Sequence, residues 1–192
     1  MDLNVQEDKE KHIRARKMML LFSMLSIAMT FAGLTSAYIV SKSRPDWIID
    51  FQLPSAFFIS TIVIITSSIS MLMAKKNVNK NNIKATSIWL VVTFLLSVIF
   101  VISQFSGFDQ LISKGYFFTG PQSTVTTSFL YVLAVLHLAH LFAGMIVLLV
   151  VFFNNQKNKY NMDKLGFELA VTFWHFLGFL WLYLFVFLYF FR

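Results

Sequence analysis

The chain has 192 residues, of which 57% are hydrophobic and only 13% are charged, and its mean hydropathy is +0.70. Charged residues normally make up about a quarter of a soluble domain, so this composition excludes water as the main solvent of the chain. No cysteine is present, which excludes disulfides, thiolate metal sites and cysteine nucleophiles. The formal net charge of +7 raises the question of an acidic partner such as nucleic acid, and the positions of the basic residues have to answer it.

The chain begins with a polar segment, residues 1–17, that ends in a basic cluster beside the first apolar residues. This segment is predicted to be a cytoplasmic polar tail, and residues 18–192 to form a single transmembrane domain. Five apolar stretches follow the tail, at residues 18–40, 53–74, 88–108, 129–153 and 165–191. Each is long enough, at about 1.5 Å per residue, to cross a hydrocarbon core of about 30 Å. Backbone in lipid must satisfy its own hydrogen bonds, so the sequence predicts an all-α, polytopic bundle of five transmembrane helices.

The basic residues are distributed unevenly between the two sides of this bundle. With the N-terminus inside, twelve of the sixteen Lys and Arg lie in the tail and in the second and fourth connections. Only Lys42, Arg44, Lys114 and Arg192 then lie outside. The excess of positive charge on cytoplasmic segments predicts the N-terminus inside and the C-terminus outside. The basic character of the chain is thus explained by topology, and no nucleic-acid partner is expected.

Two other local patterns concern the connections and the packing. The segment from Gly107 to Thr127 is the longest connection and is expected to lie along one membrane face. Small residues recur at the spacing that allows two helices to approach closely, and they predict packing faces on the first and fourth helices. They are Ala32, Gly33, Ser36 and Ala37 in the first, and Ala139, Ala143 and Gly144 in the fourth.

Four ionisable side chains lie within the apolar stretches, namely His137, His140, Glu168 and His175. Such groups are expensive in a membrane, so each needs a partner. His137 and His140 are three residues apart and share a helical face, and so do Glu168 and His175, which are seven apart. The simplest arrangement pairs the two faces, with Glu168 accepting hydrogen bonds from a histidine or a backbone group. The sequence therefore predicts a structural polar network and no catalytic residue in this chain.

The alternative interpretation of these four side chains is a metal or haem site, since they are adequate ligands for zinc, iron or copper. Their spacing argues against a di-iron centre, which needs several inward glutamates and a Glu-x-x-His pattern. A haem held by one axial pair of these histidines remains an alternative. Trp174 and Trp181 lie on the same helix as His175, and they are expected either to pack against a neighbouring helix or to contact lipid.

Several of these residues fall into longer motifs. The last stretch reads GFE at 166–168, WHF at 174–176 and WL at 181–182. The fourth stretch carries Phe129, Tyr131 and an H-x-x-H-x-x-x-G pattern from His137 to Gly144. The first stretch reads AGLTSAYIV at 32–40. Together these motifs resemble the cytochrome c oxidase subunit III family of the haem-copper terminal oxidases. The resemblance extends over nearly the whole chain beyond the tail. It is closest to the short five-helix form, known among bacteria, that lacks the first two of the usual seven helices.

The resemblance implies a non-catalytic subunit of an oxidase that passes electrons to dioxygen while pumping protons. Haem and copper would then be bound by subunits I and II, and this chain would bind no cofactor. It would stabilise subunit I, bind phospholipid in a cleft and support proton uptake, in a bacterial cytoplasmic membrane. The implied partners are subunits I and II and membrane phospholipids, with a larger respiratory supercomplex as a further option.

Two positions depart from the family pattern. An intramembrane glutamate often follows the serine that corresponds to Ser26, but the next residue here is Ile27. An aspartate is common three residues after the histidine of the WHF motif, and this position is Gly178. Proton chemistry within this subunit is therefore not expected. The alternatives left open are subunit III of a quinol oxidase, a small membrane transporter, and a membrane protein with two haems or a metal.

Overall fold

The structure is a computed structural model that describes residues 2–45, 47–48, 53–120, 123–161 and 163–191. Its five long helices are α1 (Asp2–Val40), α2 (Ser55–Asn79), α3 (Ile83–Ser113), α4 (Val125–Gln156) and α5 (Leu165–Phe190), with one-turn helices η1 (Ser41–Ser43) and η2 (Lys159–Asn161). Each long helix has the length and hydropathy needed to cross a membrane. The predicted all-α fold with five spans is confirmed, and the orientation across the membrane stays a prediction.

The helix ends differ from the predicted ones where local hydrogen bonding favours a longer helix. α3 begins at Ile83 because the Asn82 side chain accepts a hydrogen bond from the backbone N–H of Ala85 at 3.1 Å. It continues to Ser113, so the first part of the segment expected along a membrane face belongs to this helix. α4 begins earlier than predicted, behind a capping box in which Thr124 and Thr127 satisfy each other's backbone N–H.

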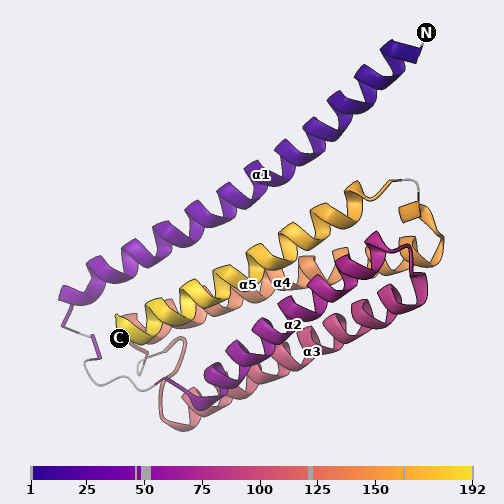
Figure 1. The fold of residues 1–192 in the computed structure, drawn as a ribbon. Coiled ribbons are helices and arrows are strands. Elements are labelled where there is room, and N and C mark those ends of the chain that lie inside the picture. Colours follow the sequence, from indigo (N-terminus) through magenta and orange to yellow (C-terminus); the bar gives the residue numbers. More distant parts are fainter. Residues whose placement is uncertain (1, 46, 49–52, 121–122, 162, 192) are drawn as a thin grey trace.

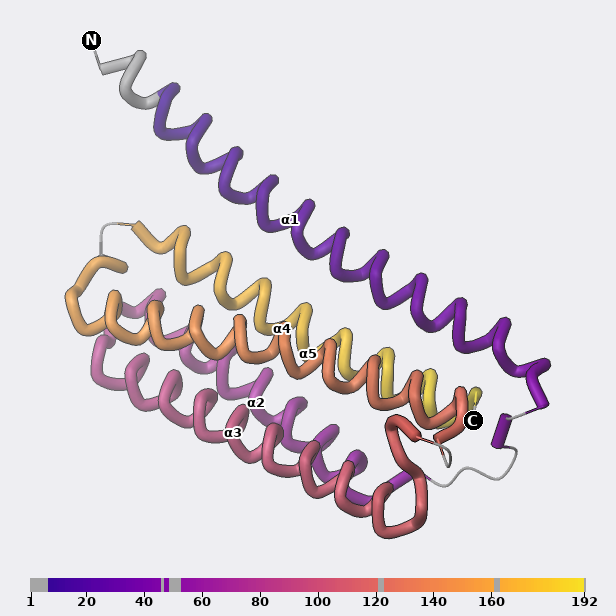
Figure 2. Tube along the Cα trace, turned by 180° about the vertical axis from the view of Figure 1, so that it is seen from behind, coloured from indigo at the N-terminus to yellow at the C-terminus, as the bar shows by residue number. Residues whose placement is uncertain are grey.

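Helices α2 to α5 form a closely packed four-helix bundle (Figures 1 and 2). In each of α3 and α4, one series of buried positions recurs at alternating steps of three and four residues, the spacing typical of helices that cross at a shallow angle. The series comprises residues 86, 90, 93, 97, 100, 104, 107 and 111 in α3, and residues 127, 130, 134, 137, 141, 144, 148, 151 and 155 in α4. Residues 108, 126, 131, 133 and 138 are buried beside these series. Small and hydroxyl-bearing residues in the series, such as Ser97, Gly107 and Gly144, let the backbones approach.

Helix α1 leans away from this bundle over most of its length (Figures 1 and 2). Among its described side chains, only Phe31, Thr35 and Tyr38 are buried, and all three lie toward its C-terminal end. The Thr35 hydroxyl lies 2.8 Å from the Tyr183 hydroxyl of α5, and the Tyr38 ring packs edge-on against Trp47 with ring centroids 4.7 Å apart. α1 is therefore fixed to the bundle at one end only.

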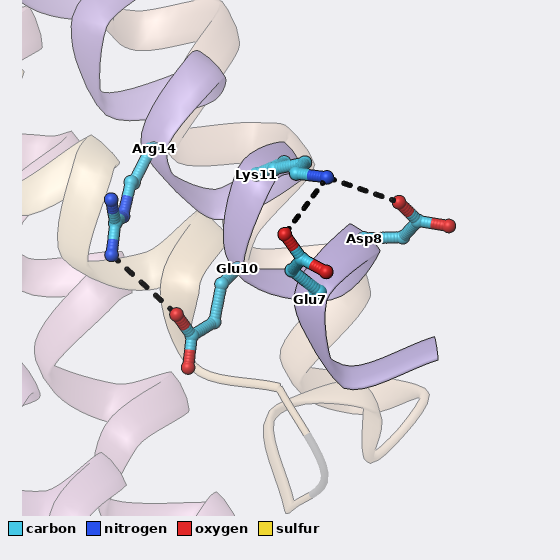
Figure 3. A network of polar contacts seen from close by, with 5 residues as sticks. All are labelled: Glu7, Asp8, Glu10, Lys11 and Arg14. Atoms are coloured by element: carbon cyan, nitrogen blue, oxygen red, sulfur yellow. Dashed lines mark ion pairs between the residues drawn. The ribbon is translucent and has the colours of Figure 1, made fainter. Parts of the chain in front are cut away.

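The other end of α1 is a charged extension of the same helix. Lys11 lies 3.2 Å from Glu7 and 4.0 Å from Asp8, and Arg14 lies 3.5 Å from Glu10 (Figure 3). All five side chains are exposed, and the pairs are three or four residues apart, which supports a helix in water. The segment predicted as a polar tail is thus helical and continuous with the first span.

Candidate functional site: a polar core and two lateral grooves

Two tryptophans of α5 fill the centre of the bundle, where both are fully buried. The indole N–H of Trp174 donates to Ser67 Oγ at 3.1 Å, and that of Trp181 donates to Thr61 Oγ1 at 3.1 Å. Both acceptors belong to α2, so each tryptophan joins the two helices by a hydrogen bond as well as by its apolar area. Buried Trp is stable in such a core only where its N–H finds a partner.

His137 lies in the same core and is completely buried. Its ring packs against Trp181 with centroids 5.2 Å apart and against Phe100 of α3 at 5.9 Å. Neither ring nitrogen has a hydrogen-bond partner among the described residues. The imidazole therefore acts as one member of an aromatic cluster.

His140 points out of the core, toward α1. Its Nδ1 lies 2.8 Å from the carbonyl oxygen of Leu136 one turn earlier, so the ring is held by its own helix. The ring also packs edge-on against Phe31 of α1, with centroids 5.9 Å apart. His140 consequently lines the space between α1 and the bundle.

Glu168 and His175 lie on a different side of the bundle. Glu168 is exposed in the first turn of α5, and His175, two turns on, is half-buried with Nε2 enclosed and without a hydrogen-bond partner among the described residues. No hydrogen bond or ion pair in the described part of the chain connects Glu168 or His175 with His137 or His140. The structure thus brings the two histidines of α4 near each other and leaves the two residues of α5 apart from them.

The polar groups that do connect the core are hydroxyl and amide side chains that the sequence analysis did not single out. Gln104 donates to Ser60 Oγ at 2.8 Å, and Ser70 and Thr93 share a hydrogen bond between α2 and α3. Asn155 donates to the carbonyl oxygen of Ile83 at 3.1 Å at one end of the bundle. The available signal was the three-and-four spacing of Ser and Thr in the second and third stretches, which places them on one helical face.

The side chains present do not fit a haem or metal centre in this chain. Within the described residues, no group of three or more His, Cys, Asp or Glu lies close enough to hold a metal ion. The rings of Phe100 and Trp181 occupy the space around His137, and the described residues do not supply a set of three His, Cys, Asp or Glu side chains around His140. A metal site needs several convergent donors, and here the four ionisable side chains diverge.

Two grooves flank α5 at the level of the membrane. The α1 cleft has a volume of about 440 Å³ and is lined by Leu20, Ser23, Ile27, His140, Ala143, Val147, Gly166, Leu169, Ala170 and Phe173. The α2–α5 groove has a volume of about 240 Å³ and is lined by Ile64, Ile65, Ser68, Ile69, Leu72, His175, Gly178, Phe179 and Leu182. The two linings share no residue, and each carries one histidine.

A third cavity continues the α1 cleft toward the charged extension. It has a volume of about 420 Å³ and is lined by Lys9, His12, Ile13, Arg16, Asp163 and Leu165. The α1 members of this lining and of the α1 cleft recur every three or four residues, so they form one helical face. That face is basic at the N-terminal end and apolar farther along. Lys11 and Arg14, which are paired with carboxylates, lie off this face.

The connection between α4 and α5 closes the bundle at the same end as this cavity. Asp163 precedes the N-cap residue of α5, Lys164, and its side chain accepts a hydrogen bond from the backbone N–H of Leu165 at 2.9 Å. The Tyr160 ring packs edge-on against Phe167 with centroids 5.5 Å apart. Burial raises the pKa of Tyr160, with a further upward contribution from Asp163, and a hydrogen bond with Asn154 opposes the shift.

Comparison with known proteins adds a family relation to this geometry. The family model described as cytochrome c oxidase subunit III matches residues 10–192. Cytochrome c oxidase subunit 3 of Bacillus sp. (strain PS3) is 28% identical over 166 residues, which cover 83% of this chain and 77% of that protein. Subunit 3 of the cytochrome bo(3) ubiquinol oxidase of Buchnera aphidicola subsp. Schizaphis graminum is 30% identical over 173 residues, or 86% of this chain and 88% of the relative. Cytochrome c oxidase subunit 3 of Thermostichus vulcanus is 25% identical over 187 residues, which cover 93% of this chain and 89% of that protein.

Proposed function

We propose a supporting, non-catalytic role for this chain. The chain belongs to the cytochrome c oxidase subunit III family and is therefore a multi-pass membrane subunit of a respiratory haem-copper oxidase. In this role, subunits I and II bind the haem and copper, and this chain stabilises subunit I and helps to sustain proton uptake. One observation carries the proposal. Among the described residues, the ionisable side chains of its spans have separate surroundings and do not form a group that could hold a metal ion.

The four ionisable side chains then have separate structural roles. His137 completes the aromatic core with Trp174 and Trp181 nearby, and His140 lines the α1 cleft. Glu168 is exposed, and His175 is half-buried in the lining of the α2–α5 groove. We expect a bacterial cytoplasmic membrane and an N-terminus on the cytoplasmic side, which puts the basic residues of α1 at the inner surface.

We also propose that the α1 cleft holds a phospholipid. The apolar face that includes Leu20 and Ile27 suits an acyl chain, and Lys9 and Arg16 at its basic end suit a phosphate. The order of these features along α1 matches the order of headgroup and acyl chain in a bilayer. No described carboxylate lies within ion-pair distance of Lys9 or Arg16, so both charges are free to meet an anion.

Purification through a tag on this chain tests the main proposal. In a mild detergent that keeps the oxidase active, we expect two larger subunits to co-purify with haem and copper in stoichiometric amount. Absence of both under these conditions would overturn the assignment to an oxidase complex. The isolated chain should show no Soret band, and its appearance would restore the haem alternative.

Two paired substitutions test the lipid proposal. Lys9→Gln with Arg16→Gln should reduce the phospholipid retained by the complex in native mass spectrometry. The matched control is Lys11→Gln with Arg14→Gln, which removes the same charge from the other side of the helix. Equal lipid loss from both pairs would show that general positive charge is responsible.

The electron donor is a separate question, since similar proteins include subunits of both cytochrome c and ubiquinol oxidases. The purified complex should be assayed with reduced cytochrome c and with a quinol. Activity with the quinol alone would place this chain in a quinol oxidase without altering its proposed role.

A further inference from the structure

We propose that Asp163 is an internal counter-anion for Lys9 and Arg16 of α1, and that these three residues form a clasp across the charged end of the α1 cleft. The clasp closes when no phosphate group lies between its two sides. The inference deepens the proposed lipid site, on which it rests for the ligand, by adding how this chain regulates access to that site.

The two sides of the clasp face each other across one cavity. Lys9 and Arg16 of α1 and Asp163 of the α4–α5 connection all line the cavity of about 420 Å³. The three side chains are exposed, and none lies within ion-pair distance of an opposite charge in the described part of the chain. The opposite charges on the two walls therefore attract each other without competition from another ion pair of these residues.

The cations of the α1 extension differ between its two sides. Lys11 and Arg14 lie 3.2 Å and 3.5 Å from carboxylates of their own helix (Figure 3). Lys9 and Arg16 are seven residues apart, or about two turns, and lie on the face toward the cavity. The charges that turn toward the bundle are thus the ones that α1 itself leaves unpaired.

Asp163 is held in place beside the start of α5. Its Oδ1 accepts the hydrogen bond from the backbone N–H of Leu165 at 2.9 Å, and its own backbone N–H donates to the Lys159 carbonyl oxygen at 3.4 Å. Lys159 and Lys164 are close to it in sequence, but neither ammonium group lies within ion-pair distance of the carboxylate. A stationary carboxylate whose charge is unpaired is suited to receive a cation from α1.

Helix α1 has the form of a lever. It is continuous from Asp2 to Val40, and the described side chains that it buries lie between Phe31 and Tyr38, while its charged end leans away from the bundle (Figures 1 and 2). His12, in the middle of the basic face, lies about 28 Å along the helix from Phe31 at about 1.5 Å per residue. A tilt of about 10° at the attached end therefore moves the basic face by about 5 Å.

The clasp and a phospholipid use the same two cations. Lys9 and Arg16 form the proposed phosphate site, and Asp163 has the same sign of charge as a phosphate, so the two anions compete. An exposed ion pair changes an equilibrium by a factor of up to about five. Asp163 therefore lowers the occupancy of the site without excluding a lipid, whose acyl chain gains further contact in the apolar part of the cleft.

Distances between spin labels in the assembled complex test the clasp. The labels are attached to Ala15→Cys, which does not line the cavity, and to Gln156→Cys at the exposed end of α4. The complex is measured in non-ionic detergent without added phospholipid. Asp163→Asn keeps an oxygen acceptor for Leu165 and removes the charge, so we expect the mean distance to increase by about 3–5 Å. About 0.5 M NaCl should cause the same increase in the unaltered clasp, since the Debye length is then about 4 Å.

The matched control is Asp109→Asn, which removes an exposed carboxylate near the other end of the bundle. An equal distance in the Asp163 and Asp109 variants would overturn the inference. Lys9→Glu with Asp163→Lys, which exchanges the two charges, should restore the shorter distance. If the Asp163 variants do not accumulate, Lys9→Gln with Arg16→Gln tests the other side of the clasp, and an unchanged distance there would overturn it equally.

Lipid binding separates this inference from the proposed function. With dioleoylphosphatidylglycerol added below saturation, Asp163→Asn should retain up to about five times as much lipid in native mass spectrometry as the unaltered complex. Inorganic phosphate should not replace the lipid, because it has no acyl chain. Equal lipid retention would overturn the competition. Absence of lipid from every variant, together with the longer distance in Asp163→Asn, would overturn the proposed lipid site and support the clasp alone.

Discussion

The four-helix bundle and helix α1 are built from similarly apolar sequence and yet pack differently. Only 11% of the most apolar 18-residue stretch of α1 is buried, against 28% to 50% in the other four helices. The bundle has hydroxyl, amide and small residues at regular intervals on its inner faces, joined by hydrogen bonds between helices. α1 has one such interhelical bond among its described side chains, between Thr35 and Tyr183.

This difference teaches that hydropathy and helix association are separate properties in a membrane. Lipid tails solvate apolar side chains as well as a neighbouring helix does, so burial of Leu or Ile gives little association energy. Close packing and interhelical hydrogen bonds supply it instead. The bundle can thus hold together within one chain, and α1 depends on lipid or on other subunits to fill the space beside it.

The largest expected contrast between the two regions comes from removing an aromatic side chain. Trp181→Ala should destabilise the bundle by about 3–5 kcal/mol, because it removes a buried ring and its hydrogen bond to Thr61, whose hydroxyl still donates to the Phe57 carbonyl oxygen. Phe22→Ala removes a 60% exposed ring from α1 and should change the stability of the isolated chain little. Unfolding in mixed micelles measures both. Equal losses would show that α1 is packed as tightly as the bundle.

Adding a methyl group to a glycine should give the next largest contrast. A Cβ at Gly107 would lie 2.5 Å from the Phe57 ring, so Gly107→Ala should cost about 1–3 kcal/mol through overpacking. Gly33 of α1 has no atom within 4 Å of the corresponding position, and Gly33→Ala should be neutral or slightly stabilising. The same unfolding assay applies. If Gly33→Ala instead weakens retention of partner subunits, the exposed face of α1 is an interface.

The attachment of α1 offers a smaller and more local test. Tyr183→Phe removes the hydrogen bond to Thr35 and should cost about 0.5–1.5 kcal/mol, with wider motion of α1 as the consequence. Because the chain has no cysteine, spin labels at two introduced cysteines report the distance between α1 and α5 directly. The control is Thr66→Ala, since that hydroxyl bonds only the Ile62 carbonyl of its own helix. An unchanged distance distribution in the tyrosine variant would show that the ring contacts of Phe31 and Tyr38 hold α1 without this hydrogen bond.

The closed end of the bundle should be sensitive to alkaline pH. Burial raises the pKa of Tyr160, so its neutral form is favoured in the folded chain. The stabilisation that this raised pKa contributes to the folded chain is present below the unfolded pKa of about 10 and is lost as the pH rises above it. The free energy of unfolding, measured between about pH 9 and pH 11, should therefore decline, and this decline should be smaller in the Tyr160→Phe variant. A decline of the same size in both proteins would assign it to other groups.

The charged extension of α1 should show the smallest effect. Lys11→Ala removes the exposed contacts with Glu7 and Asp8 and should reduce the stability of this helical segment by about 0.3–0.5 kcal/mol, which lowers its helicity. The effect should disappear at high ionic strength, since exposed pairs are screened. Circular dichroism of the chain with and without salt measures it. A change in the stability of the bundle would show that the extension contacts more than water.

The distribution of small residues shows where sequence pattern was sufficient and where it was not. Gly144 and Gly33 both follow a small-residue spacing and were both predicted to face packed helices. A Cβ at Gly144 would lie 2.7 Å from Leu177, which confirms close packing in α4, whereas Gly33 is open on the described chain. Spacing identifies a face on a helix, and it does not say whether another helix of the same chain is present there.

The sequence by itself determined the number and approximate limits of the spans, because transfer of apolar side chains to lipid and the satisfaction of backbone hydrogen bonds are properties of each helix alone. It also determined the family, through motifs such as the GFE and WHF segments of α5.

Only the tertiary structure decided where the ionisable side chains point. His137 and His140 share a face by spacing, but one enters the core and the other meets α1, while His175 opens into a separate groove. The rotation of each helix about its axis depends on all of its neighbours at once. Local pattern contains no record of those neighbours, and so the sequence predicted one network for two histidines of α4 and two residues of α5 that the packed helices place in different surroundings.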